Sequence, residues 1–208
     1  MAKDIIKHRG NTRAIALYNP SDEACKFIIQ PDTLEFKGSL KIRDLNKKKE
    51  LGVYSTIEMT LPPHSAKVLK VEGKRIEPTR YEAEWGYCPD FTGINSTGVK
   101  YVHKTEASCG AVAQNIGGSA TNYLEWKNVF SEKGGKYILK VRIFPYNKSE
   151  FNVIVNGNSY PICTKDTQGM PIDFPLEVTL KKGNNIVKLT NPMTTLPPID
   201  CIILEKQP

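Results

Sequence analysis

The sequence predicts an all-β protein made of β-sandwich domains, and two observations lead to this prediction. Apolar and polar residues alternate along many short segments: in residues 136–144 (KYILKVRIF), Tyr137, Leu139, Val141 and Ile143 share one face. This period of two is typical of a strand with one buried face. Helical periodicity extends over no more than two turns anywhere in the chain. We therefore expect strands, and not helices, to form the core.

Short runs rich in β-branched and aromatic residues recur along the whole chain. Turn-forming pairs such as Asn19-Pro20, Gly134-Gly135 and Asn156-Gly157 separate these runs. Glycine and asparagine favour tight turns because they adopt backbone angles that other residues avoid. Many short strands at this spacing are typical of β-sandwiches. The predicted strands are residues 13–18, 25–29, 38–43, 53–60, 65–71, 122–130, 136–144, 151–155, 176–180, 184–190 and 199–204.

A polar stretch predicts a domain boundary in the first half of the chain. Residues 72–79 (EGKRIEPT) contain Gly73 and Pro78 and follow the strand-like run SAKVLKV. We therefore divide the chain into an antiparallel β-sandwich at 1–72, a linker at 73–79 and a second β-sandwich at 80–208. A domain of roughly 75 residues gains little stability from its own core. The front domain is expected to lean on a neighbour, which is either the second domain or one outside this chain.

The net charge of +7 raises the question of a nucleic-acid partner. Residues 1–76 carry 15 Lys and Arg against 9 Asp and Glu, whereas residues 77–208 carry 14 against 13. The excess peaks at Lys47–Lys49, a short run between strand-like segments that is typical of a solvated hairpin tip. No RNA-recognition signature, zinc-finger spacing or basic helix is present. We expect no nucleic-acid partner. We also expect no membrane partner, because no apolar run approaches the ~20 residues of a membrane helix.

The sequence offers no catalytic constellation. It contains no G-x-S-x-G elbow, no phosphate-binding glycine loop and no H-E-x-x-H motif. The five cysteines are widely spaced, which excludes the usual zinc-site patterns, and Cys88 with Cys109 is the pair to test first for a disulfide. The residues therefore predict a non-catalytic protein.

One acidic constellation stands out in Tyr81-Glu82-Ala83-Glu84-Trp85. On a strand, Glu82 and Glu84 would point to the same face. Like charges repel unless a cation lies between them or one takes a proton, and an oxygen-rich cluster suits Ca²⁺. Asp200 precedes the last apolar strand and would join them if the first and last strands of the domain are neighbours. The alternative is that both glutamates face solvent.

From Tyr81 to Leu204 the chain resembles the carbohydrate-binding modules of families 6 and 35. The resemblance rests on an ordered set of motifs: YEAE, SCGAVAQNIGG, NYLEWKNV, GGKYILKVRIF, FNVIVNG, LKKGNNIVKL and PPIDCIIL. It implies that the second domain is a jelly roll with a structural calcium ion. The ligands implied are Glu82, Glu84 and Asp200, completed by main-chain carbonyls from the loop at 105–108.

The front domain resembles the C-terminal β-sandwich of family 27 glycoside hydrolases, the α-galactosidase type. The matching segments are RAIALYNPSDEACKFII and LKIRDLNKKKELGVYSTIEMTLPPHSAKVLKV. In that family the sandwich follows a (β/α)₈ barrel that carries the catalytic aspartates. Such a barrel needs at least ~200 residues, and none of it is present here. The resemblance implies a non-catalytic accessory region whose partner is the missing catalytic domain, in a periplasmic or secreted parent enzyme. The chain itself shows no signal peptide.

The resemblance also implies a sugar cleft that would hold galactose-containing oligo- or polysaccharides. Related modules stack the sugar between a Tyr and a Trp, with an Asn from the final loop. Asn191 matches that Asn, the Tyr position falls near Asn115, and the Trp position falls in a loop that offers Met170. Tyr146 could replace a missing aromatic, whereas Trp85 and Trp126 are expected in the core. The candidate ligand-binding residues are therefore Asn191, Tyr146, Asn115 and Met170. The alternative is a structural or interaction sandwich with a vestigial cleft.

Overall fold

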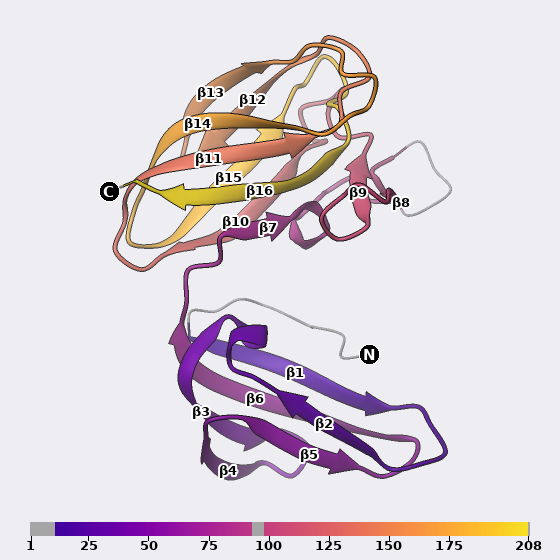
Figure 1. The fold of residues 1–208 in the computed structure, drawn as a ribbon, viewed down its shortest axis with the longest axis vertical. Helices are drawn as coiled ribbons and strands as arrows, with labels where there is room; N and C mark the ends of the chain where they lie inside the picture. The colour runs from indigo at the N-terminus through magenta and orange to yellow at the C-terminus, as the bar shows by residue number, and fades with distance from the viewer. Residues whose placement is uncertain (1–10, 93–97, 208) are drawn as a thin grey trace. The chain divides into compact units, whose positions relative to one another are not determined.

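A computed structural model of the protein describes residues 11–92 and 98–207. The chain forms two compact units, Met1–Glu77 and Pro78–Pro208 (Figure 1). The division falls inside the predicted linker at 73–79. The first residues of that segment are not linker, however, because the last strand of the first unit continues to Arg75.

The first unit is the antiparallel β-sandwich that the sequence predicts. One sheet has the strand order β1-β6-β3-β4, and a second sheet pairs β2 with β5. Alternate residues of β1 are buried, and they join Phe36, Leu40, Ile42, Leu69 and Val71 in a core between the sheets. The strands are β1 (Thr12–Asn19), β2 (Cys25–Ile29), β3 (Phe36–Asp44), β4 (Lys49–Tyr54), β5 (Ile57–Leu61) and β6 (Ser65–Arg75), with a short 3₁₀ helix η1 (Asp32–Leu34) after β2.

Two predictions for this unit have different outcomes. The lysine run does form an exposed hairpin tip: the chain turns at residues 45–48 between β3 and β4, and Lys48 has a φ of 53°. The single strand predicted at 53–60 is wrong, because the chain bends at Ser55 and Thr56 and divides this segment between β4 and β5. These two strands belong to different sheets.

The second unit is a jelly-roll sandwich, as predicted. One sheet follows the order β14-β11-β16-β9-β8, with β7 also paired to β16, and the other follows β10-β15-β12-β13. Both sheets contribute apolar side chains to one core, including Leu139, Val141, Val153 and Val187. The strands are β7 (Arg80–Glu82), β8 (Lys100–His103), β9 (Ala111–Gln114), β10 (Leu124–Ser131), β11 (Gly135–Ile143), β12 (Glu150–Val155), β13 (Asn158–Cys163), β14 (Ile172–Leu180), β15 (Gly183–Thr190) and β16 (Ile199–Lys206).

Several details of the second unit differ from prediction. Strands β8, β9 and β13 were not among the predicted strands. Pro161 is tolerated in β13 because this strand lies at the edge of its sheet. Trp126 is buried as expected, but Trp85 is 60% exposed because the chain leaves β7 for the short 3₁₀ helix η2 (Ala83–Trp85). Cys88 and Cys109 do not form a disulfide, and all five cysteines are free thiols.

Among residues 11–92 and 98–207, no helix is long and apolar enough to span a membrane.

Candidate functional site: a carboxylate cluster and a loop cleft

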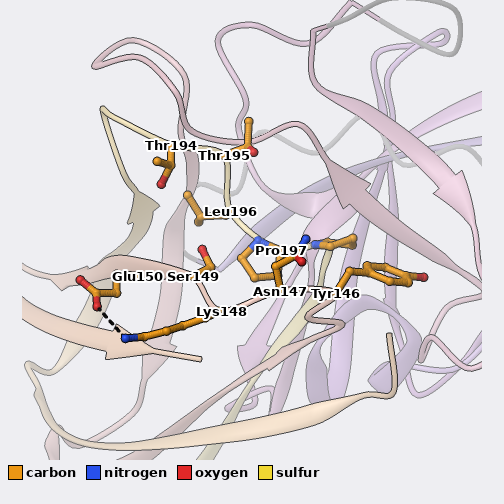
Figure 2. A pocket seen from close by; sticks show the side chains of 10 residues that line it. Tyr146, Asn147, Lys148, Ser149, Glu150, Thr194, Thr195, Leu196 and Pro197 are labelled. Atoms are coloured by element: carbon orange, nitrogen blue, oxygen red, sulfur yellow. Dashed lines mark ion pairs between the residues drawn. The ribbon is translucent and has the colours of Figure 1, made fainter. Parts of the chain in front are cut away.

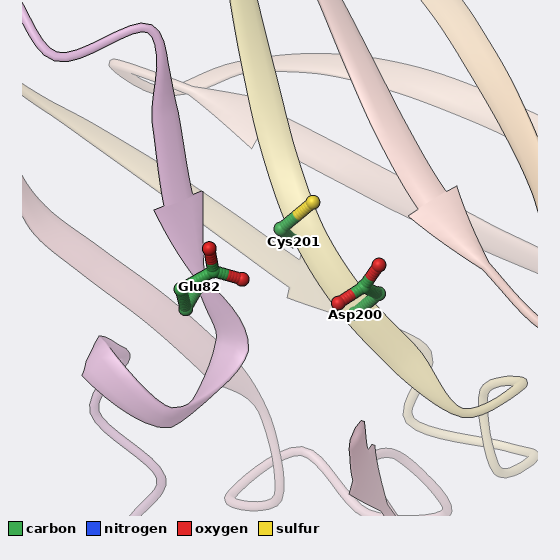
Figure 3. A group of neighbouring side chains, drawn as sticks. All are labelled: Glu82, Asp200 and Cys201. Atoms are coloured by element: carbon green, nitrogen blue, oxygen red, sulfur yellow. The ribbon is translucent and has the colours of Figure 1, made fainter. Parts of the chain in front are cut away.

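Pairing between the first and last strands of the second unit gathers the acidic residues. Strand β7 runs antiparallel to β16, with Glu82 opposite Cys201, which places the side chain of Asp200 beside Glu82 (Figure 3). Ligand atoms of Glu82, Asp200 and Cys201 lie within 4.8 Å of one another, and all three residues are buried. Burial raises the pKa of the Cys201 thiol to about 12. Because Ca²⁺ prefers oxygen ligands, Glu82 and Asp200 are the candidate calcium ligands of this group.

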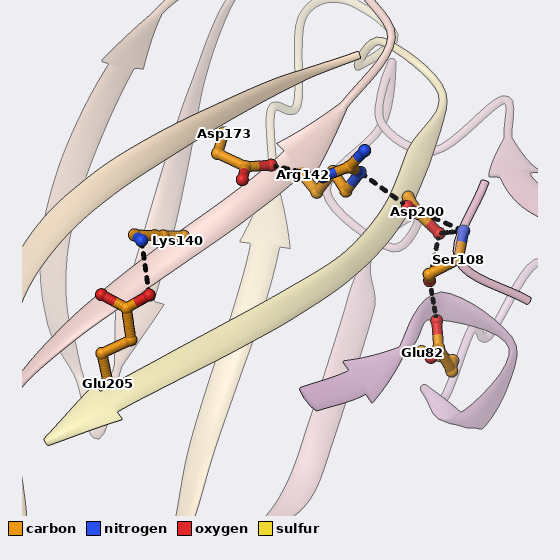
Figure 4. A network of polar contacts seen from close by, with 7 residues as sticks. All are labelled: Glu82, Ser108, Lys140, Arg142, Asp173, Asp200 and Glu205. Atoms are coloured by element: carbon orange, nitrogen blue, oxygen red, sulfur yellow. Dashed lines mark hydrogen bonds and ion pairs between the residues drawn. The ribbon is translucent and has the colours of Figure 1, made fainter. Parts of the chain in front are cut away.

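Ser108 lies between two of these carboxylates (Figure 4). Its hydroxyl is 2.5 Å from Glu82 Oε2 and 2.7 Å from Asp200 Oδ1, and its main-chain N–H donates to Asp200 at 3.0 Å. A hydroxyl has one proton and can donate to only one of the two acids. The Ser108 main-chain N–H also faces Asp200, whereas the carbonyl ligands expected from the loop at 105–108 stay a prediction.

Two arginines supply positive charge from the flanks of the cluster. Arg80 Nε lies 2.9 Å from Glu82 Oε1, and Arg142 Nε lies 3.1 Å from Asp200 Oδ2. Arg142 is shared, because its Nη1 is also 3.4 Å from Asp173 (Figure 4). Glu82 and Asp200 are thus each compensated in part.

Glu84, the third predicted ligand, is the uncompensated member. Both of its carboxylate oxygens are buried and have no hydrogen-bond partner among the other described residues. Desolvation raises the pKa of Glu84 and outweighs a hydrogen bond to its own backbone, which lowers the pKa; the charges of Glu82 and Asp200 raise it further. Glu84 lies in the short helix η2, and not on a strand face shared with Glu82. Its ligand atoms do not belong to the group formed by Glu82, Asp200 and Cys201. The structure therefore brings Glu82 and Asp200 together, and Glu84 as a third ligand stays a prediction.

A cleft of about 540 Å³ opens at the loop end of the same unit (Figure 2). Its walls come from the loop between β11 and β12 and the loop between β15 and β16. Polar side chains face it from both loops, and Lys148 and Glu150 form an exposed ion pair 3.9 Å apart. The lining residues are Tyr146, Asn147, Lys148, Ser149, Glu150, Thr194, Thr195, Leu196, Pro197 and Pro198.

Tyr146 is the aromatic residue of this cleft, and its side chain is held from two sides while remaining 51% exposed. The ring lies against the backbone of Gly169, so close that a Cβ at residue 169 would be 2.3 Å from Tyr146 Cε1. The ammonium of Lys104 donates to the Tyr146 hydroxyl at 3.3 Å.

The other three predicted ligand-binding residues do not line the cleft. The amide of Asn191 is engaged within the loops: its Nδ2 donates to the Glu150 carbonyl at 2.5 Å and to Thr194 Oγ1 at 2.9 Å. Asn115 Nδ2 donates to the Gly98 carbonyl at 3.2 Å. Met170 is 64% exposed at the end of a turn outside the lining. Asn191 therefore joins the two walls of the cleft without facing into it.

Sequence reasoning missed most of the cleft wall. The polar run Asn147–Glu150 directly after a predicted strand, and the run Thr194–Pro198 directly before the last one, were available as signals. Loops at the ends of strands form binding sites more often than the strands themselves do. Both runs could therefore have been predicted to line a binding cleft.

No family model matches the chain, and no curated protein matches it either. Among solved structures, a family 35 carbohydrate-binding module from Clostridium thermocellum is 22% identical with a TM-score of 0.54, over 61% of this chain and 98% of that one. The second unit therefore has the fold of a carbohydrate-binding module.

Longer enzymes also contain similar regions. Isomalto-dextranase from Arthrobacter globiformis T6 is 18% identical with a TM-score of 0.55, over 94% of this chain and 35% of that one. An exo-β-1,3-galactanase from Phanerochaete chrysosporium, solved with β-1,3-galactotriose, is 20% identical with a TM-score of 0.52, over 64% of this chain and 30% of that one. The chain thus spans about a third of the length of these two enzymes.

Proposed function

We propose that this chain is a non-catalytic accessory region of a glycoside hydrolase of the α-galactosidase type, and that its second unit binds galactose-containing glycans. The observation that carries the proposal is the loop cleft with Tyr146 at one end. A tyrosine ring receives the apolar face of a pyranose, and nearby polar groups bind the hydroxyls. Ser149, Thr194 and Thr195 supply such groups, and they neighbour the charged pair Lys148 and Glu150.

The galactose preference and the parent enzyme are proposed from both units. Galactose is favoured by the α-galactosidase-like motifs of the front unit and by the likeness of the second unit to a region of an exo-β-1,3-galactanase. We further propose that the front unit packs on the catalytic barrel of the same polypeptide. The small apolar core of this unit fits a domain that gains stability from a neighbour.

We also propose that Glu82, Glu84 and Asp200 hold a structural Ca²⁺ ion. The support is the fit of the residues: Glu82 and Asp200 lie together, an arginine compensates each of them in part, and the nearby Glu84 has buried side-chain oxygens that bind no other described residue. Bound calcium would supply the missing positive charge. It would also link η2 to β16, because ligands from both elements would share it.

Titration calorimetry of the full chain with β-1,3-galactotriose and other galactose-containing oligosaccharides, in calcium, tests the binding proposal. We expect Tyr146→Ala to weaken binding at least about tenfold, because stacking on the ring is lost. Tyr18→Ala is a matched control, since Tyr18 is a similarly exposed tyrosine (49%) in the first unit. It should leave the affinity unchanged.

The competing function is a structural or interaction sandwich with a vestigial cleft. One observation favours it: the amide that would contact sugar, Asn191, is fully engaged in shaping the loops. The absence of heat for every glycan tested in the presence of calcium, with a normal melting temperature, would support this alternative and contradict the proposal.

A further inference from the structure

The loop at 104–110, between β8 and β9, contacts both the carboxylate cluster and the cleft. At one point Ser108 donates its main-chain N–H to Asp200 and places its hydroxyl between Asp200 and Glu82. At another point Lys104 donates to the Tyr146 hydroxyl, with its ammonium 4.6 Å from the centroid of the Phe144 ring. One short loop therefore touches the candidate cation ligands and the aromatic residue of the cleft.

The loop is braced, so its two contacts are not independent. Three main-chain hydrogen bonds close it: Lys104 N–H to the Gly110 carbonyl at 2.9 Å, Ala107 N–H to the Lys104 carbonyl at 3.1 Å, and Gly110 N–H to the Ala107 carbonyl at 3.1 Å. Ala107 also packs in a small buried cluster with Val112 and Phe144. A shift at Ser108 is therefore passed to Lys104 and to the segment that carries Tyr146.

Lys104 sets both the position and the hydrogen-bonding role of Tyr146. An ammonium group is only a donor, so the Tyr146 oxygen accepts from it and the phenolic proton points elsewhere. The Lys104 side chain is only 19% exposed, and Tyr146 is further held by the backbone of Gly169. Tyr146 is thus presented to the cleft as a fixed ring with a free O–H donor.

The same loop depends on the state of the carboxylates. Glu82 and Asp200 share two arginines and the single hydroxyl proton of Ser108. Repulsion between the two carboxylates opposes the anchor at Ser108, and a loop with a weaker anchor must be ordered further when ligand binds. A cation bound by both carboxylates would offset this repulsion and hold the acceptors of Ser108 in place.

We infer that the loop at 104–110 couples the carboxylate cluster to the cleft, with Lys104 as the positioning residue of Tyr146. This inference rests on the proposed function and adds that a cation regulates glycan binding. Cation binding raises the affinity of the cleft for glycan, and glycan binding raises the affinity for the cation by the same factor, because linkage is reciprocal. The expected factor is about five- to tenfold, at the lower end of typical couplings.

The first experiment needs no glycan. The full chain, labelled at its tyrosine rings, is titrated with CaCl₂ after chelator treatment and followed by NMR, with the Tyr146 signals assigned from Tyr146→Phe. We expect the Tyr146 signals to move with calcium in the native chain and in Lys104→Arg, which keeps a donor, but not in Lys104→Met, which keeps only the apolar stem. Lys206→Met is a matched control, since its ammonium also lies 5.8 Å from a tyrosine ring, that of Tyr137. It should leave the response intact.

The second experiment measures the affinity for β-1,3-galactotriose with calcium and with chelator in the same four proteins. We expect the calcium-dependent gain in the native chain, Lys104→Arg and Lys206→Met, and its loss in Lys104→Met. Tyr146 signals that ignore calcium, or a calcium response that survives in Lys104→Met, would overturn the coupling. If Tyr146 responds to calcium but no glycan binds, the coupling stands and the proposed function fails.

Discussion

The two units bury carboxylates in opposite ways. In the first unit, Asp44 accepts a hydrogen bond from the Lys47 main-chain N–H at 2.9 Å and lies 3.3 Å from Lys67 Nζ. These partners, the Lys47 N–H first, hold the pKa of Asp44 below its ordinary value. In the second unit, Glu84 has no partner for either oxygen among the other described residues, and the pKa of Glu84 is raised, first by desolvation.

The difference shows where each unit finds its compensating charge. Asp44 takes its compensation from the hairpin turn and from Lys67 on the neighbouring strand, within the first unit. Glu82, Asp200 and the nearby Glu84 carry more negative charge than two arginines can compensate, and Arg142 is divided between Asp200 and Asp173. An isolated buried charge is costly. The second unit, and not the first, should therefore respond to a cation.

The largest expected effect is that of chelation. Removing calcium should lower the melting temperature of the second unit, because a ligand that binds only the folded state stabilises that state. At a calcium concentration 100 times the Kd, the stabilisation is ~2.7 kcal/mol. This corresponds to a shift of roughly 5–10 °C in the melting temperature of a unit of this size. Hydrogen exchange read by mass spectrometry assigns the loss to each unit. Protection in the first unit should not change. An identical melting temperature with and without chelator would contradict the proposal that a cation stabilises the second unit.

The effect of Glu84→Gln on the stability of the second unit should change sign when calcium is added. Without calcium the substitution removes a desolvated like charge and stabilises the second unit by ~0.5–1 kcal/mol, kept small by solvent screening. With calcium it removes a ligand and destabilises the unit by at least ~1 kcal/mol. Thermal melts in both conditions measure this. Asp44→Asn is the control and should destabilise the first unit equally in both, since its partners belong to the protein. A Glu84→Gln effect of one sign throughout would contradict the assignment of Glu84 as a ligand.

The two carboxylates should give opposite pH slopes in calcium-free protein. The folded pKa of Glu84 lies above its ordinary value of 4.5, so the folded second unit binds more protons and loses stability as pH rises through that range. The folded pKa of Asp44 lies below 3.8, so its stabilisation is present above that value and is lost as pH falls. Exchange protection of each unit from about pH 3 to about pH 7 checks both slopes. Parallel slopes in the two units would refute the comparison.

The smallest expected effect concerns the cleft. The position of Tyr146 depends on contacts within its own unit, just as the charge of Asp44 is compensated within the first unit. Gly169→Ala places a Cβ against Tyr146, at a residue whose φ is +76°. It should weaken glycan binding about three- to tenfold by moving the ring, with ~1 kcal/mol of backbone strain. Gly157→Ala introduces similar strain at a φ of +94° but has open space around it. Gly157→Ala should lower stability as much as Gly169→Ala does and leave the glycan affinity unchanged. Equal losses of affinity in the two variants would show that backbone strain, and not the position of the Tyr146 ring, causes the effect.

The sequence was sufficient for the architecture because alternation and turn pairs are local signals. It missed the strands β8, β9 and β13, and it placed Trp85 in the core, where η2 replaces a continued strand. The closeness of Glu82 and Asp200 was predictable, because they lie on the first and last strands of the domain. Arg80 could also have been predicted, since it precedes Glu82 by two residues on the same strand. Ser108 and Arg142 could not, because they reach the two carboxylates from other elements. The role of Asn191 depends on loop hydrogen bonds that no single segment encodes.

The indole of Trp126 donates from its Nε1 to the main-chain carbonyl of Glu82 at 2.8 Å, inside the core. The only other tryptophan is Trp85, which follows Glu84 directly in the sequence and is exposed. Each of the two tryptophans of the chain therefore touches or adjoins a candidate cation ligand, one buried in the core and one exposed. We expect the tryptophan emission of the unlabelled protein to contain a blue component from Trp126 and a red component from Trp85, both sensitive to a cation at this site.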